Sequence, residues 1–422
     1  MAITNLQAPA QFKPAYNPLW FYLSGSNFSH ADYSFVFQVN VDDDFDGSYT
    51  TMASVRVPSL IDSSGNPTGY AYFDAHRIVE DYCNHELDLS QYGFYYNRGL
   101  VSYQVKVAEY YDGAVQTGYT TLTTAGSQAF GAALDSFKFA DYNQSDYVVS
   151  SAPATESYLS NSPRTLNIYS NQHAFLSALI TGSGTAKAKK AKIKTYNSAG
   201  TLIQTIDVTN NYQNVNTYRE GKFIRFSCGT AALNSISGGD ITAGAQPIIT
   251  ASVASYTIQF FDGADTVTQL FTYNIVDNCS KYDNYRFHWL NELGGWDSAN
   301  FSLLSRNNLK INRDAFNRSL GTASASAFSY QISDRGKINN YINATESITV
   351  NSDWLIDAEF VWLKELVMSP NVFVEDNSTG TIRLLPVLIT DTSFEVKKLA
   401  NESLNQMQLT FEYGKTIERQ RW

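Results

Sequence analysis

The sequence has few of the features that mark nucleic-acid binding or export. Charged residues make up only 17% of its 422 residues, below the ~25% typical of soluble domains, and the net charge is −10. Because a phosphate backbone is bound by a basic surface, this balance predicts no nucleic-acid partner. The first residues have neither the basic nor the apolar segment of a secretory signal, so none is expected.

Long apolar runs and paired cysteines are also lacking. No stretch of 18 apolar residues occurs, which predicts that nothing spans a membrane. The three cysteines, Cys83, Cys228 and Cys279, are far apart and odd in number. They form no disulfide framework, and this fits folding in a reducing cytosol.

Recognisable catalytic motifs are lacking as well. There is no Gly-x-Ser-x-Gly turn and no glycine-rich phosphate loop, and the five histidines are scattered. We therefore expect no catalytic residues and no cofactor. A pair of carboxylates suited to glycoside hydrolysis stays open, because the separation that matters there is spatial and not sequential.

Aromatic residues, in contrast, are plentiful. They make up 14% of the chain, with 28 Tyr and 25 Phe. Strands favour aromatic residues, and Tyr also suits surfaces that become buried between subunits, so both interpretations stay open.

Two alternating runs end in Asp-Gly and predict tight hairpins. Residues 101–111 lead into Asp112-Gly113, and residues 256–261 lead into Asp262-Gly263. Both turn residues tolerate the positive φ angles of a two-residue hairpin loop.

The spacing of these hairpins predicts a mainly β chain with a few helices. We expect tandem antiparallel β-sandwich-like modules followed by an α+β C-terminal module. The predicted modules are residues 1–148, a β module with one helix; 149–283, a β-sandwich; and 284–422, the α+β module. A Ser/Ala/Pro/Thr stretch, 150–163, predicts the linker between the first two.

Helices are predicted at three places. The first runs from Asp74, a plausible N-cap, to about Glu86, and a second helical patch covers 128–135. The third runs from Ser352 to Met368 with Ser352 as its N-cap. Its apolar stripe is predicted to be Trp354, Leu355, Ala358, Val361, Trp362 and Leu366.

The acidic turn at 42–47 is a weak candidate for calcium. Asp42, Asp44, Asp46 and Gly47 match the start of a calcium-binding loop, in which alternate carboxylates converge on one cation. The position of the final bidentate Glu is occupied by Ala53, and the flanks are strands, so a solvated acidic hairpin is the favoured interpretation.

Three other groups of residues have a functional and a structural interpretation. Cys83, His85 and Glu86 lack the further ligands of a zinc site, which favours a buried Cys beside a surface His. The lysine-rich run 187–194 could meet an anionic glycan or an acidic subunit, but lysines guarding an edge strand are favoured. The basic tail 415–422 could dock on a neighbouring subunit, although a loose terminus is more common.

Three segments resemble a recurrent virion protein of tailed phages that infect Bacteroidota. They are Tyr16-Asn-Pro-Leu-Trp-Phe-Tyr22 with Phe73-Asp-Ala-His-Arg-Ile-Val-Glu-Asp-Tyr82; Arg286-Phe-His-Trp-Leu-Asn-Glu-Leu-Gly-Gly-Trp-Asp-Ser298; and Leu366-Val-Met-Ser-Pro-Asn-Val-Phe-Val374 through Leu385-Pro-Val-Leu-Ile-Thr-Asp391 to Leu409-Thr-Phe-Glu-Tyr413. The resemblance implies a tail, baseplate or connector component that assembles in rings. The middle module matches nothing in this family.

These observations lead to one favoured hypothesis and two alternatives. The favoured one is a non-enzymatic virion structural protein, assembled in the host cytoplasm as a homo-oligomer that holds other virion proteins. The first alternative is a receptor- or glycan-binding module whose exposed aromatics stack on sugars of the host surface. The second is a glycoside-active enzyme.

Overall fold

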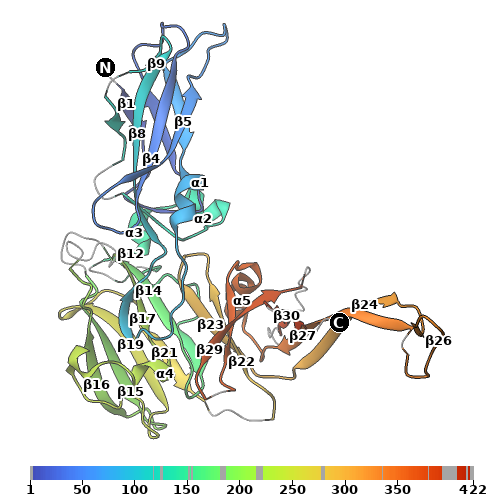
Figure 1. Cartoon of the computed structure of the whole chain (residues 1–422). Helices are drawn as coiled ribbons and strands as arrows, with labels where there is room; N and C mark the ends of the chain where they lie inside the picture. Colours follow the sequence, from blue (N-terminus) through green and yellow to red (C-terminus); the bar gives the residue numbers. More distant parts are fainter. Residues whose placement is uncertain are drawn as a thin grey trace. The chain divides into compact units, whose positions relative to one another are not determined.

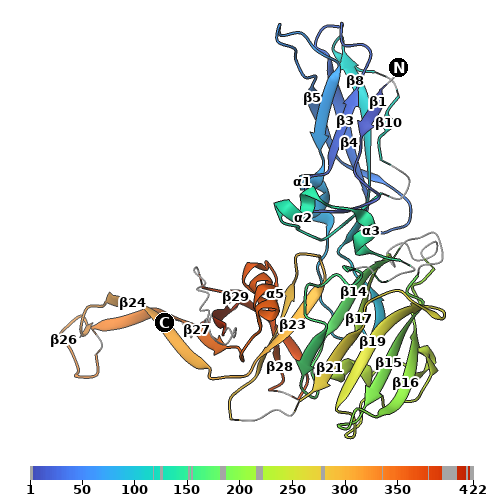
Figure 2. The ribbon, with the colours of Figure 1, turned by 180° about the vertical axis from the view of Figure 1, so that it is seen from behind.

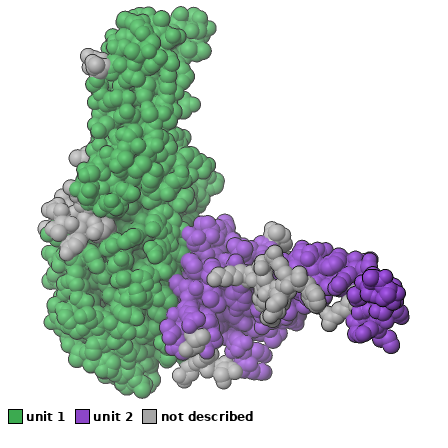
Figure 3. All heavy atoms as spheres, in the orientation of Figure 1, with its two compact units in different colours: residues 1–278, 290–298 green, residues 279–289, 299–422 purple. Residues whose placement is uncertain are grey.

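The chain divides into two compact units, which Figure 3 colours separately. Unit 1 comprises residues 1–278 and 290–298, and unit 2 comprises residues 279–289 and 299–422. The computed structural model describes residues 3–116, 118–123, 127–150, 153, 155–180, 187–214, 222–276, 281–334, 336–378, 380–391, 406–414 and 417–418.

The predicted fold class is confirmed, because the chain is mainly β with few helices and several antiparallel sheets (Figures 1 and 2). Unit 1 contains the first two predicted modules, and one strand of the first, β7 (Gly93–Tyr96), pairs with a strand of the second, β17 (Phe223–Ser227). The module boundaries after residues 148 and 283 stay predictions.

The first sandwich of unit 1 packs a small sheet against a large one. The small sheet has the order β1-β3-β6 and the large one β2-β11-β8-β4-β5. Inward side chains of both sheets share one core, in which the rings of Phe37 and Phe73 stack with centroids 4.6 Å apart. The strands are β1 (Thr4–Gln7), β3 (Trp20–Ser24), β6 (Tyr70–Asp74), β2 (Phe12–Pro14), β11 (Gln128–Phe130), β8 (Leu100–Tyr111), β4 (Ser34–Asp42) and β5 (Thr50–Pro58), with β9 (Ala114–Val115) and β10 (Thr120–Thr121) beside β8.

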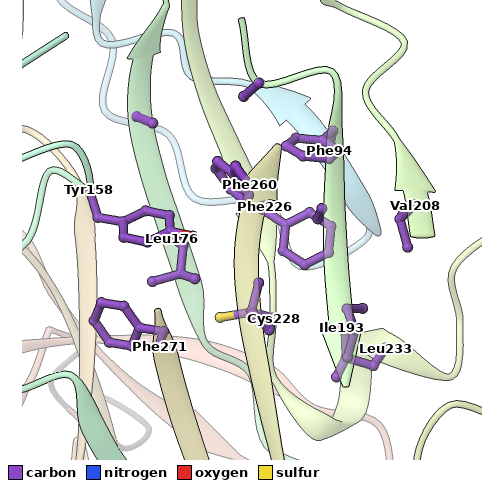
Figure 4. Close-up of a cluster of buried hydrophobic side chains, with 14 of the residues drawn as sticks. Phe94, Tyr158, Leu176, Ile193, Val208, Phe226, Cys228, Leu233, Phe260 and Phe271 are labelled. Carbon is purple, nitrogen blue, oxygen red and sulfur yellow. The ribbon is translucent and has the colours of Figure 1, made fainter. Parts of the chain in front are cut away.

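The second sandwich of unit 1 has its own aromatic core (Figure 4). Phe94 of β7 lies 4.8 Å from Phe226 and 5.0 Å from Phe260, measured between ring centroids. The two sheets contribute these rings from opposite sides. One sheet is β12 (Val148–Val149), β14 (Phe175–Ile180), β17 and β7; the other is β13 (Thr165–Ile168), β21 (Phe271–Ile275), β19 (Ser255–Asp262), β15 (Lys190–Tyr196), β16 (Leu202–Thr209) and β18 (Ile241–Ala243), with β20 (Asp265–Thr266) beside β19.

Unit 2 is built on one sheet and one long helix, α5 (Asp357–Met368). The indole rings of Trp362 on α5 and Trp289 lie 5.0 Å apart between centroids. His288 beside them is fully buried and bonds Glu375 over 2.9 Å. The sheet order is β23 (Trp296–Phe301), β22 (Tyr285–Leu290), β28 (Val372–Asp376), β29 (Arg383–Ile389), β30 (Gln408–Tyr413), β27 (Lys337–Asn351) and β24 (Arg306–Asn317), with β31 (Ile417–Glu418) beside β27 and a separate pair, β25 (Thr322–Ala323) and β26 (Phe328–Ser329).

Two of the predicted helices begin or end elsewhere, and one is a strand. The first is short, α1 (His76–Val79) followed by η1 (Glu80–Tyr82), because Cys83 turns to extended backbone. The patch at 128–135 is wrong, since its first three residues form β11 between β2 and β8. The other short helices are α2 (Ser136–Ala140), α3 (Gln144–Tyr147), α4 (Thr230–Leu233) and η3 (Gly238–Asp240).

The third predicted helix starts five residues later than expected. Ser352 does not cap it, because its Oγ accepts a hydrogen bond of 2.8 Å from the amide of Met407 beside β30. The predicted stripe is wrong at Trp354, Ala358 and Val361, which are exposed, and right at Trp362 and Leu366, which are buried.

The predicted linker at 150–163 is wrong for residues 157–160, which are buried. Tyr158 and Leu159 are fully buried, and Tyr158 packs its ring edge-on against Phe260 and Phe271. Its hydroxyl accepts a hydrogen bond of 2.8 Å from Thr268. The serines of this segment are hydrogen-bonded, since Ser157 donates to Gln269 and Ser160 to Ser162.

Both predicted Asp-Gly hairpins are present, with different turn geometry. Asp112 and Gly113 both have positive φ, 54° and 79°, between the paired strands β8 and β9. In the second hairpin Asp262 is still paired, opposite Asp265, and the positive φ of 66° falls on Gly263.

A buried side chain in the segment between β2 and β3 bonds the segment that follows β11. Asn17 is buried, and its amide both donates to the carbonyl of Leu134 and accepts from its N–H, each over 2.8 Å. Removal of the Asn17 amide leaves the N–H and the carbonyl of Leu134 without these hydrogen-bond partners.

We therefore expect Asn17→Ala to lower the free energy of unfolding by about 2–3 kcal/mol. Chemical denaturation of the full chain measures this. Asn274, whose amide makes only an exposed contact of 3.5 Å with Asn167, is the control, and Asn274→Ala should stay close to wild type. Equal losses in the two variants would contradict the role of Asn17.

Candidate functional site: two exposed surfaces

The outer face of the small sheet in unit 1 carries four aromatic side chains. Trp20 and Tyr22 point outward from β3, and Tyr70 and Tyr72 point outward from β6, while the alternate residues of both strands are buried. Tyr22 lies opposite Tyr72 in the ladder, and its ring stacks on that of Tyr70 with centroids 5.9 Å apart. We call these four residues the aromatic face.

Neutral and acidic polar groups border the aromatic face. Asp74 lies opposite Trp20, Ser24 lies opposite Tyr70, and Gln7 of β1 lies opposite Tyr22. The Oδ1 atom of Asp74 accepts from the amides of Leu19 and His76, over 2.8 and 3.1 Å.

A groove of about 720 Å³ continues from Trp20. Its walls include Pro9, Pro18 and Phe139, and the side chain of Lys13 also lines it. The Lys13 ammonium lies 4.7 Å from the Phe139 ring centroid and 4.2 Å from that of Tyr142, and burial lowers its pKa.

The second surface is a β-ribbon of unit 2. Strands β24 and β27 pair from Arg306↔Thr349 to Asn317↔Lys337, and β27 reaches β30 only from Ser347 onward. Figure 1 shows the ribbon extending away from α5 and β30 of the same unit. We call residues 306–346 the β-arm.

The β-arm is amphipathic and poorly covered. All twelve residues of β24 are exposed. On one face Leu309 and Ile311 alternate with polar residues, and Ala344 lies opposite Ile311. Leu309 is 52% exposed and Ile332, nearer the tip, fully exposed; other exposed apolar residues of the β-arm are Phe316, Leu320, Phe328, Tyr330 and Tyr341.

The acidic turn is closed by Asp42 itself. Asp42 is buried, its Oδ1 accepts from the amide of Asp46 and its Oδ2 from the amide of Gly47, each over 3.1 Å. In the described part of the chain, no group of three His, Cys, Asp or Glu side chains is placed to hold a metal ion. Calcium binding by Asp42, Asp44 and Asp46 stays a prediction.

Beside this turn lies a cleft of about 390 Å³ with charges of both signs. Asp43 and Asp44 line it from the turn, and Arg98 lines it from the segment before β8. The Arg98 guanidinium lies 5.7 Å from the ring centroid of Tyr96.

The ring of His85 is held in a pocket shaped by glycine. A Cβ at Gly131 would lie 2.0 Å from its Cε1 atom, so only glycine fits there. Its Nε2 lies 3.1 Å from the hydroxyl of Tyr16, and burial lowers the pKa of His85 from 6.5 to about 4. Neighbouring Cys83 packs against the core of the first sandwich, and burial raises the pKa of its thiol.

The lysine-rich strand is not at a sheet edge, contrary to the favoured interpretation. It forms β15, which pairs with both β16 and β19. Lys189 forms an ion pair with Asp262 over 2.5 Å, and Lys190 forms one with Asp207 over 2.6 Å. The ladder is irregular at its start, because the amide of Lys189 donates to the carbonyl of Phe261 although Lys190 lies opposite that residue.

Other predicted positions have structural partners or lie outside the description. His30 bonds Asp112 over 3.0 Å, and His76 lies 2.9 Å from Asp74. Cys279 lies outside the described residues, as does the tail 415–422 apart from Ile417 and Glu418. The described residues include no helix that is long and apolar enough to cross a membrane.

Sequence reasoning missed both exposed surfaces, although signals were present. On β3 and β6 both parities are apolar or aromatic, which indicates that one set must face outward. On the β-arm the signal is the alternation of Leu309 and Ile311 with polar residues. Its many asparagines are poor strand formers and hide this pattern.

The comparisons with known proteins give no family. No family model matches the chain, and no curated protein matches it. Among solved structures it is compared with a marsupial T cell receptor, at 9% identity and a TM-score of 0.17, with 99% of each chain covered. The alpha-2-macroglobulins of Salmonella and E. coli align at 8% identity with TM-scores of 0.15 and 0.17, over 100% and 99% of this chain and 34% of theirs. No conclusion about the fold or the function of this chain follows from similarity this low.

The pocket of His85 predicts a pH dependence of stability. Between the folded pKa of about 4 and the unfolded value near 6.5, only the unfolded chain binds a proton at this ring. The contribution of the neutral ring is therefore complete above pH ~6.5 and is lost as pH falls towards 4. As the pH falls over this range, wild type should lose about 3 kcal/mol more stability than His85→Gln.

Chemical denaturation at a series of pH values measures this difference. The control is His30→Gln, because His30 is more exposed and lies at the hairpin surface. Parallel pH profiles of wild type and His85→Gln would show that His85 does not titrate in this way.

Proposed function

We propose that the chain is a non-enzymatic structural protein of a tailed-phage virion. It assembles in the host cytoplasm with copies of itself and with other virion proteins of the tail, baseplate or connector. The resemblance of the segments 16–22, 286–298 and 366–374 to a phage virion protein supports the proposed place in a virion. The β-arm is the observation that supports assembly with other copies.

Few contacts within a single chain stabilise the β-arm. Residues 313–317 and 337–342 form a ribbon of only two strands, which is at best marginally stable in water, and Leu309 and Ile311 are exposed at its base, where β31 pairs with β27. Exposed apolar patches of this kind mark interaction sites. The free side of β24 also offers unpaired backbone groups to an added strand.

Charge favours a second copy of this chain as the occupant. Residues 306–346 contain six Arg and Lys and three Asp and Glu, a net charge of +3, in a chain whose total is −10. A basic arm is attracted by an acidic neighbour, and the remainder of another copy is acidic. A contact between the β-arm of one copy and the acidic remainder of the next copy joins two different surfaces. Such a contact forms a closed ring when the rotation from each copy to the next adds up to a full turn.

A second candidate function, recognition of a host-surface glycan, is favoured by the aromatic face. It uses a surface in unit 1, whereas assembly uses the β-arm of unit 2. The two functions therefore do not exclude each other.

Replacing the apolar side chains of the β-arm should prevent assembly. We expect the wild-type chain to form oligomers at micromolar concentration, and Leu309→Asn with Ile311→Asn to weaken them at least about tenfold in Kd. High salt should weaken the wild-type oligomer as well, because the attraction is partly electrostatic. Mass photometry of the purified protein measures each result.

The matched control carries Leu202→Asn and Ile203→Asn, which change an exposed apolar pair on β16 in unit 1. It should assemble as the wild type does. A wild-type chain that stays monomeric would contradict assembly through the β-arm. Absence of the chain from the proteins of purified virions would contradict the virion role.

A further inference from the structure

We propose that the aromatic face binds a neutral oligosaccharide. An exposed aromatic residue is unremarkable alone, but here four converge on one side of two paired strands. Trp20 is 53% exposed and Tyr72 is 60% exposed, although their neighbours Phe21 and Phe73 are buried in the core. The sheet therefore fixes the backbone beneath the aromatic face, and the rings meet a ligand without much loss of freedom.

The geometry suits sugar rings. Side chains two residues apart on a strand lie about 7 Å apart, so Trp20 and Tyr22 can each hold a different ring of one chain. The apolar C–H side of a pyranose packs on an aromatic ring, whose broad face is apolar and whose position is fixed by only two side-chain torsions.

Polar side chains lie beside the aromatic face, where they can form hydrogen bonds with the hydroxyl groups of a sugar. Gln7, Ser24 and Asp74 lie opposite members of the aromatic face in the ladder. The Oδ1 atom of Asp74 is used by two backbone amides, and Oδ2 accepts no hydrogen bond from the described residues. A largely apolar surface with a few fixed polar groups is typical of small-molecule sites.

The groove extends the surface beyond Trp20. Its volume of about 720 Å³ is bordered by Pro9, Pro18 and Phe139, which add apolar contact to one end of the aromatic face. An oligosaccharide that stacks on Trp20 can therefore continue into the groove.

A protein partner needs more area than the aromatic face offers. An aromatic side chain buries 150–250 Å², so the exposed fractions of Trp20, Tyr70 and Tyr72, at 53%, 42% and 60%, leave roughly 100 Å² each. With half-buried Tyr22 the total is roughly 400 Å², half of the ~800 Å² that each partner of a stable complex buries.

Electrostatics separates a neutral sugar from the other ligands that stack on aromatic rings. Nucleic acid bases stack in the same way, but their phosphates need cations. Lys13 is the one cationic side chain that lines the groove among the described residues, and it lies against the rings of Phe139 and Tyr142. Asp74 beside Trp20 repels phosphate and uronic acids alike.

The experiment uses the full chain with neutral hexose oligosaccharides, uronic-acid oligosaccharides and single-stranded oligothymidylate as probes. We expect binding to neutral oligosaccharides at about 1 mM or below, followed by a change in tryptophan fluorescence from exposed Trp20. Trp20→Ala and Tyr72→Ala should each weaken binding about tenfold, and Trp20→Tyr should retain most of it. Circular dichroism of each variant checks that it is folded.

The matched control is Tyr92→Ala, because Tyr92 is as exposed as Tyr70 but is not part of the aromatic face. It should bind as the wild type does. The proposal is overturned if no neutral oligosaccharide binds, if the uronic-acid or thymidylate probe binds more tightly, or if the Trp20 and Tyr72 variants bind normally. The Leu309→Asn, Ile311→Asn variant separates this site from assembly, since it should bind each oligosaccharide with wild-type affinity per chain.

Discussion

Pairing of β7 with β17 makes one unit of the two sandwiches. Strand β7 lies between two strands of the first sandwich in sequence, but Phe94 lies in the core of the second. Arg225 of β17 is buried under this ladder and donates to the carbonyls of Glu86 and Asp88, over 3.4 and 3.3 Å. Burial lowers its pKa to about 10, so the guanidinium depends on these carbonyls for stabilisation. This joint fixes the first sandwich, which carries the aromatic face, to the second sandwich of unit 1.

Exposed apolar and aromatic side chains occur on both surfaces, but the two surfaces differ in how well the backbone beneath them is supported. In β3 and β6 one parity of side chains fills the core, and the aromatic rings of the other parity are exposed or half-buried on a supported sheet. The β-arm has no such support, since β24 lies at the end of its sheet. A supported surface can bind a small molecule without changing shape, whereas an unsupported ribbon gains its stability from the partner. This contrast supports the proposals of sugar binding by the first surface and of assembly through the second.

Local patterns were read correctly from the sequence, and long-range ones were not. The Asp112-Gly113 turn depends only on neighbours in the chain, and the sequence predicts it. The start of α5 was not, because Ser352 bonds the amide of Met407, 55 residues away. Residues 128–130 form a strand because β2 and β8 lie on both sides. Tyr158 is buried by partners in other segments, which a Ser-rich composition does not reveal. The aromatic face could not be predicted from the sequence for the same reason, because only the packing of the sheets determines which alternate side chains of β3 and β6 point outward.

Asn17 and β2 have a consequence for synthesis of the chain. Strand β2 pairs with β11, and the amide of Asn17 pairs with Leu134, so both wait until residues 128–134 have left the ribosome. At 5–20 residues per second this takes roughly ten seconds. The turn at Asn291 waits longer, since its amide donates to the carbonyl of Leu159, and Gly294 packs against the backbone of Gly131. Unit 1 therefore closes only after the chain has passed residue 298, whereas β1 and β3 can pair as soon as residue 24 has left the ribosome.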